Sequence, residues 1–219
     1  MAYTEERLKR VIELIKEMES RKEHKYAAAT YRDVPALREL DSIVKEQLDS
    51  EHPHTLGTLT DSIFAVRYLG NAYESMWRIP YANKYYKWLL ELHGELYRLF
   101  GEKDDECSDD YYGALRARNY HADDSCPDLA ELAKAFLPDK KRLDIEKRVL
   151  VDSRPLRHDP VELTDEYLAV IDEVDRRMDT EECKKAHPFV RNQIFCDLLR
   201  EYGIEWEPLT SLNPGMHFD

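Results

Sequence analysis

The most constraining feature of this sequence is the helical rhythm of its apolar side chains between residues 56 and 76. Apolar residues recur there at intervals of three or four positions, which places them in one stripe along an α-helix. The stripe consists of Leu56, Leu59, Ile63, Val66, Leu69, Tyr73 and Met76. A helix with one apolar stripe has to bury it against another element. The segment therefore predicts a helix packed within a larger helical assembly.

The same spacing predicts helices on both sides of this segment. Proline is tolerated in the first turn of a helix, and Pro35 and Pro80 introduce two of them, over residues 35–51 and 81–100. Gly101 is placed to end the second one. The other segments with helical spacing are 5–22, 109–120, 127–136, 143–150, 161–178 and 188–202. Only 7 of the 219 residues are glycine, which disfavours a many-turned sandwich or barrel. The predicted fold class is all-α.

The charge of the chain limits its partners. Lysine and arginine number 32 and aspartate and glutamate 45, a formal net charge of −13 that opposes non-specific attraction to nucleic acid and to anionic lipid. No segment approaches the roughly 20 apolar residues of a membrane helix, and residues 1–20 are too charged for a secretory signal. The four cysteines include no CxxC pair, which fits a reducing compartment. We expect a cytoplasmic protein that binds neither nucleic acid nor membranes.

Composition also suggests a division of the chain. Residues 152–160 contain two prolines and no apolar period, as expected for a linker. Residues 1–151 precede it, and residues 161–219 would form a helical pair with an irregular tail. This pair could also pack on the first region as part of one domain.

Three prolines indicate an internal repeat. Pro35, Pro80 and Pro127 each lie near the start of the second helix of a predicted pair, and each is followed within three residues by alanine. They are 45 and 47 residues apart. Pairs of amphipathic helices at such a period are typical of an α-solenoid, in which helical hairpins stack on one another.

The central pair resembles a tetratricopeptide repeat. The residues that carry the resemblance are Leu69, Gly70, Asn71, Ala72 and Tyr73, followed by Ala82, Tyr86, Leu89 and Leu90. Residues 48–56 resemble the inter-repeat junction of the kinesin-light-chain subgroup, in which a His-Pro pair marks the entry to the next repeat. The match covers residues 48–92. Trp77 departs from the pattern, because it stands where the turn glycine is usual.

This resemblance implies a short solenoid of antiparallel hairpins over residues 1–151, in which small residues such as Gly70 let two helices approach closely. It also implies a concave face for ligands, formed by the first helix of each pair. Arg67 and Asn71 are one turn apart on that helix and resemble a carboxylate clamp, which holds the terminal carboxylate of a peptide. The repeat period adds Arg21, Lys25 and Arg116 to the same face, and Phe64 lies one turn from Arg67.

Guanidinium groups bind carboxylates through two parallel hydrogen bonds, so this row predicts a locally basic groove. Its partner would be a protein or peptide with an acidic segment or a C-terminal carboxylate, bound without catalysis or cofactor. The structural alternative is that these residues lie on solvated helix faces and pair with nearby glutamates.

Two other functions stay open. A metal-binding protein or metal-dependent enzyme would use His121, Cys126, Asp123 and Asp124, although zinc needs three or four such groups to converge and no HExxH motif is present. The His158-Asp159 pair is similar to a ligand pair of metal phosphohydrolases, but it precedes Pro160, where we expect a helix cap. No GxSxG or matched Cys–His pair suggests a nucleophile. The third possibility is a structural homodimer that associates through aromatic residues.

Overall fold

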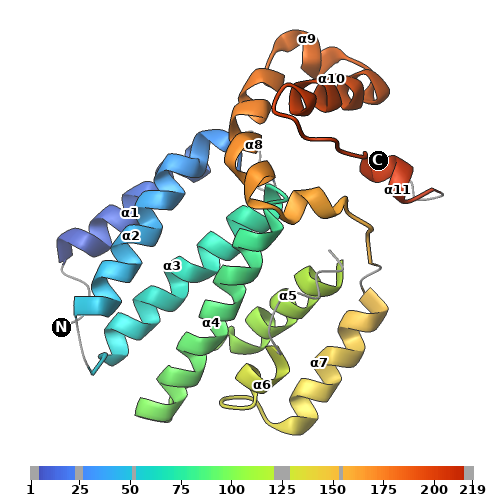
Figure 1. Ribbon diagram of the computed structural model, residues 1–219. Coiled ribbons are helices and arrows are strands. Elements are labelled where there is room, and N and C mark those ends of the chain that lie inside the picture. The colour runs from blue at the N-terminus through green and yellow to red at the C-terminus, as the bar shows by residue number, and fades with distance from the viewer. Residues whose placement is uncertain (1–4, 23–26, 51–52, 121–128, 153–154, 215–219) are drawn as a thin grey trace. The chain divides into compact units, whose positions relative to one another are not determined.

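The computed structural model describes residues 5–22, 27–50, 53–120, 129–152 and 155–214 (Figure 1). All regular elements in these segments are helices, and no strand occurs among them. The predicted all-α fold class is therefore confirmed. None of the described helices is both long and apolar enough to cross a membrane. The chain divides into two compact units, residues 1–154 and 155–219, and the division falls within the predicted linker segment.

The first unit is a succession of helices that pack on their neighbours along the chain. Helix α2 packs on α1 and α3, α4 on α3 and α5, and α5 on α6 and α7. Figure 1 shows α1 to α4 side by side. One apolar core runs through the unit, from Val11 to Leu137. The described elements are α1 (Glu5–Ser20), the 3-10 helix η1 (Tyr31–Asp33), α2 (Val34–Ser50), α3 (Leu56–Ser75), α4 (Ile79–Phe100), α5 (Cys107–Tyr120), α6 (Leu129–Ala133) and α7 (Asp139–Asp152).

Helices α3 and α4 approach each other at Gly70. A Cβ atom built on Gly70 would lie 3.2 Å from Cε1 of Tyr86, so the tyrosine ring fills the space that a larger residue would need. The Tyr86 hydroxyl in turn lies 2.9 Å from Oδ1 of Asn71 on α3. The ring of Tyr85 on α4 stacks on Tyr73 of α3, with 5.4 Å between the ring centroids. Aromatic rings of α4 thus pack against α3 around Gly70, which has no side chain.

Trp77 forms the turn between α3 and α4 with a left-handed backbone, φ 61°. Residues other than glycine and asparagine rarely adopt this conformation. The Trp77 N–H donates to Glu74 O and the Arg78 N–H donates to Tyr73 O, both at 2.9 Å. This pair of bonds is a Schellman motif, whose left-handed position is usually glycine. The backbone at this turn therefore has the glycine-like form, although the residue is tryptophan.

The second unit has its own core. Tyr167, Ile171 and Val174 of α8 are buried against Leu198 and Leu199 of α10. The described elements of this unit are η2 (Pro160–Leu163), α8 (Asp165–Met178), α9 (Glu181–Lys185), α10 (Pro188–Arg200) and α11 (Leu209–Leu212).

Buried polar contacts tie the start of the second unit to its later part. Glu162 accepts a hydrogen bond from Nε1 of Trp206 at 2.7 Å, and its other oxygen lies 2.8 Å from Nδ1 of His158. Asp159 accepts from the Val161 N–H at 3.0 Å and caps η2. The expectation of a helix cap at His158-Asp159 is confirmed, with Asp159 as the capping residue.

Candidate functional site

Arg67 is the centre of a partly buried ionic cluster in the first unit. From α3, its Nε donates to Asp110 Oδ1 at 2.7 Å and its Nη2 to Asp110 Oδ2 at 2.7 Å, so it holds this carboxylate of α5 with two bonds. The Nη2 atom also donates to Asp104 at 2.8 Å, and Nη1 lies 2.9 Å from Glu106. His93 of α4 completes the cluster, with Nε2 at 2.8 Å from Asp110 Oδ2. Helices α3 and α5 and the loop before α5 therefore meet at the guanidinium group, and α4 joins them through Asp110.

The electrostatics of this cluster favour its charged form. Burial by itself would raise the pKa of Asp110, but the hydrogen bonds from His93 and Arg67 outweigh it and hold that pKa below its usual value. Burial likewise opposes the charge of Arg67, and the bonds to Asp110 overcome it and raise the pKa of the guanidinium. Asp110 is therefore a carboxylate and Arg67 a cation at neutral pH, and their bond joins α3 to α5.

The side chains of His93, Asp104 and Asp110 have the composition of a metal site. One ligand atom from each lies within 4.8 Å of the others. Nη2 of Arg67, however, lies within 2.8 Å of both carboxylates, in the position between them that a metal ion would take. The guanidinium thus already supplies the positive charge that the two aspartates require. We assign this cluster a structural role.

A second polar network lies farther along α3, toward its C-terminal end, and also involves α4 and α5. Nη2 of Arg116 on α5 donates to Glu74 of α3 at 2.9 Å. The other oxygen of Glu74 accepts from the hydroxyl of Tyr86, which also lies 2.9 Å from Asn71. Burial, together with the charge of Glu74, raises the pKa of Tyr86 well above its usual value, so the hydroxyl keeps its proton. Arg67, Asn71 and Arg116 therefore belong to one layer of contacts between α3, α4 and α5.

The remaining residues of the predicted groove have different surroundings. Arg21 donates to Asp33 at 2.9 Å and also pairs with Glu17. Phe64 is exposed by 48%. Lys25 lies outside the described residues, as do the residues of the metal hypothesis, His121, Asp123, Asp124 and Cys126.

The three arginines predicted for the groove all bind carboxylates of the same chain. This arrangement shares with the structural alternative that the arginines pair within the chain, but Arg67 binds Asp104 and Asp110 in a partly buried cluster and not nearby glutamates on a solvated helix face. Arg67 alone faces Asp104, Glu106 and Asp110, so the local charge around it is negative. A peptide carboxylate would have to compete with charge-assisted bonds that are already formed.

The sequence did not single out His93, Tyr86 or Asp110 as partners of this face. Asp110 lies in the first turn of α5, where a carboxylate is favoured by the helix dipole without any other partner. Its real partner is 43 residues away. The sequence carries one signal for this contact, because acidic residues outnumber basic ones directly after Gly101, over residues 102–110.

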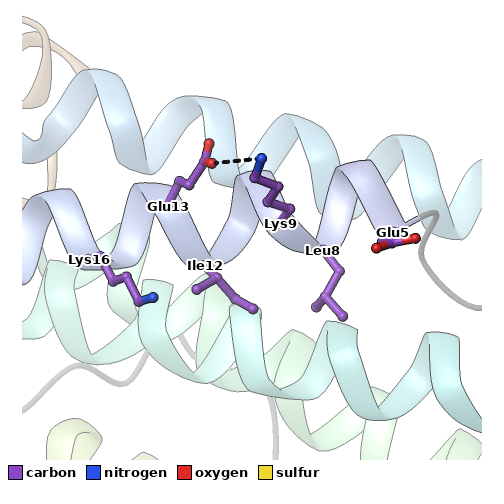
Figure 2. Close-up of a pocket in the computed structure, with 6 residues that line it drawn as sticks. All are labelled: Glu5, Leu8, Lys9, Ile12, Glu13 and Lys16. Carbon is purple, nitrogen blue, oxygen red and sulfur yellow. Dashed lines mark ion pairs between the residues drawn. The ribbon is translucent and has the colours of Figure 1, made fainter.

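An apolar face on α1 and α3 is the other candidate for binding. A hollow of about 350 Å³ on α1 is lined by Glu5, Leu8, Lys9, Ile12, Glu13 and Lys16. Figure 2 shows Leu8 and Ile12 pointing toward α3, and Lys9 and Glu13 pairing on the opposite side. Ile12 is exposed by 39%.

Helix α3 contributes exposed apolar residues next to this hollow. Arg7 of α1 binds Gln47 near the end of α2, whereas Arg21 binds Asp33 before its start, so α1 and α2 are antiparallel. The short connection from α2 to α3 makes α1 and α3 parallel. The Tyr68 hydroxyl donates to Glu19 of α1 at 2.8 Å. Phe64 precedes Tyr68 by one turn and so lies at the level of Ile15 and Lys16.

Comparison with known protein families, curated proteins and solved structures finds no match to this chain. The contacts of its own residues are therefore the basis for the function proposed below.

Proposed function

We propose that this protein is a non-catalytic binding protein, built as a short tetratricopeptide-like solenoid, which holds a segment of another protein on its α1–α3 face. We define this face by the exposed side chains Ile12, Lys16 and Phe64 and the half-buried Leu8. Two features of the fold support the solenoid. Successive helices pack on their neighbours along the chain, and the central hairpin combines a close approach at Gly70 with a left-handed turn after α3.

The exposure of Phe64 is the observation that carries the proposal. A phenylalanine 48% exposed in the middle of a long helix keeps much of its apolar surface in water. The next turn of α3 is fixed, because Arg67 is bound to Asp110 and Tyr68 to Glu19. Phe64 is therefore presented by a rigid backbone, and binding through it costs little conformational entropy. Aromatic side chains in such positions often supply most of the energy of an interface.

At one end of this face, Lys16 favours an acidic group in the partner. Lys16 is exposed and lines the hollow, and no ion pair joins it to a carboxylate within the described part of the chain. Arg21 and Arg67, in contrast, already have acidic partners. The partner we propose has an apolar side chain for Phe64 and Ile12, and an acidic residue or C-terminal carboxylate that reaches Lys16.

Peptide display on the full-length chain tests this proposal. Peptides selected on the wild-type protein are measured by fluorescence anisotropy with Phe64→Ala and with Phe100→Ala, a matched control on α4 that is exposed by 40%. We expect Phe64→Ala to weaken binding by about tenfold or more, because truncation of an interface anchor has an effect of this size. Phe100→Ala should bind as the wild type does. Equal affinities for all three proteins would contradict the proposed face.

A further inference from the structure

Helix α7 is covered on one side only. The Tyr111 hydroxyl of α5 donates to Glu146 at 2.9 Å, and the Tyr112 hydroxyl donates to Asp152 at 2.9 Å. The guanidinium carbon of Arg148 lies 4.4 Å from the centre of the Tyr112 ring. These contacts fix one side of α7 against α5.

The other side of α7 carries three of the most exposed apolar residues of the described chain. Leu143 is exposed by 52%, Leu150 by 74% and Val151 by 83%. Their spacing of seven and eight residues places them in one stripe, and Lys140 and Lys147 fall within the same stripe. We call these five residues the α7 stripe.

The charge of the α7 stripe is positive in a chain whose net charge is −13. Lys140 and Lys147 are exposed, and no ion pair connects either of them to a carboxylate in the segments that the structure describes. Asp139 and Asp144, at the two edges of the stripe, are exposed too. Asp139 pairs with Arg142, so Asp144 leaves one positive charge of the stripe in excess. The stripe therefore combines uncovered apolar surface with cations that are available to a partner.

We propose that the α7 stripe is a docking surface for an acidic amphipathic helix of another protein. Such a helix would cover Leu143, Leu150 and Val151 with its apolar face and place carboxylates beside the two lysines. This surface is separate from the α1–α3 face, and the inference does not depend on the function proposed for that face.

Charge also argues against the other occupants of this surface. A second copy of the chain in antiparallel orientation would match Leu143 with Leu150 and Lys147 with Glu146, whose carboxylate already accepts a hydrogen bond from Tyr111. The two Lys147 side chains would then lie within one residue of each other in this register. An anionic membrane would face a much larger part of the protein, whose net charge of −13 it would repel, whereas a single helix meets only the stripe and its lysines. An acidic amphipathic helix would cover the apolar residues and also place carboxylates beside the two lysines.

Three synthetic helical peptides test the proposal with the full-length protein. They share one leucine stripe and carry glutamate, glutamine or lysine at the flanking positions, and their affinities are measured by fluorescence anisotropy at low ionic strength. We expect the glutamate peptide to bind at least about tenfold more tightly than the lysine peptide, with a difference that salt reduces. The double variant Lys140→Glu/Lys147→Glu should reverse this preference.

A second pair of variants locates the binding. Leu150→Ser/Val151→Ser should weaken binding of the glutamate peptide by about tenfold or more, because it removes the apolar contact. These side chains are mostly in water, so the variant should fold, which circular dichroism checks. Phe64→Ser should leave binding of the glutamate peptide unchanged. This variant therefore distinguishes binding at the α7 stripe from binding at the α1–α3 face.

Four results would overturn the proposal. One is equal binding of the three peptides, and another is binding that ignores Leu150→Ser/Val151→Ser. The third is a dimer in light scattering that this variant dissociates, which would make the stripe a contact between copies. The fourth is stripe-dependent binding to phosphatidylserine vesicles, which would make it a membrane contact.

Discussion

Gly70 and Gly113 both lie within helices, but their surroundings differ. A Cβ on Gly70 would lie 3.2 Å from Tyr86, whereas a Cβ on Gly113 of α5 would meet no atom within 4 Å. We expect Gly70→Ala to destabilise the protein by about 1–3 kcal/mol, because the Tyr86 ring is buried and cannot move aside. Gly113→Ala should stabilise it by about 1 kcal/mol through helix propensity. Urea unfolding measures both, and shifts of the same sign would contradict the close approach at Gly70.

The left-handed backbone of Trp77 predicts an unusual order of two variants. Alanine in a helix is normally more stable than glycine by about 1 kcal/mol. At φ 61°, however, glycine avoids a steric cost of about 1–2 kcal/mol that alanine retains. Both variants lose the indole, so the comparison isolates the backbone. Thermal unfolding should show Trp77→Gly to be more stable than Trp77→Ala, and the opposite order would show that the turn is not strained.

At the scale of elements, Asp110 connects α5 to both α3 and α4. Its pKa is lowered in the folded protein, so it stabilises the fold above its unfolded pKa of about 4, and this contribution is lost as the pH falls through the lower folded value. Asp110→Asn removes the negative charge that Arg67 and His93 contact. We expect a loss of about 3 kcal/mol at pH 7, as for other broken buried ion pairs.

Urea unfolding from pH 7 to pH 2 checks this expectation. The free energy of unfolding of the wild type should exceed that of Asp110→Asn by less at low pH than at pH 7, because the wild-type carboxyl becomes neutral. A difference that stays constant with pH would mean that the variant acts through packing.

The sequence predicted some helices closely because local signals define their ends. The apolar period, Pro80 and Gly101 placed α3 and α4 within about two residues of their observed bounds. The predicted helix 161–178 was wrong in one respect, since Thr164 accepts the Tyr167 N–H and begins a new helix, leaving residues 160–163 as a separate 3-10 turn. The predicted helix 127–136 extends past Ala133, where α6 ends, and its first two residues lie outside the described residues.

The candidate site was harder to predict for a physical reason. Periodicity placed Arg67, Asn71 and Phe64 on one side of α3, and this requires only local structure. Which of them binds within the chain depends on where α5 packs, and Asp104 and Asp110 are 37 and 43 residues from Arg67. A local sequence pattern does not show which residue contacts another so far along the chain. Arg67 was therefore predicted to face a ligand.

At the scale of the whole molecule, the two units have separate apolar cores. Val174 is fully buried in the core of the second unit, and Val174→Ala should cost about 2 kcal/mol there. Hydrogen exchange should then lose protection in α8 and α10, while α3 to α5 keep theirs. Loss of protection in α3 to α5 as well would show that the two units unfold together.

The long separation between Arg67 and Asp110 also has a consequence for the order of folding. Helices α3 and α4 are joined by a short turn, so their contacts close a small loop and form early, whereas the Arg67–Asp110 bond has to wait until α5 reaches them. We expect Asp110→Asn to accelerate unfolding and to leave the folding rate nearly unchanged in stopped-flow kinetics. A slower folding rate would place this bond in the transition state. On this expectation, the ionic cluster forms after the α3–α4 hairpin and then slows its unfolding.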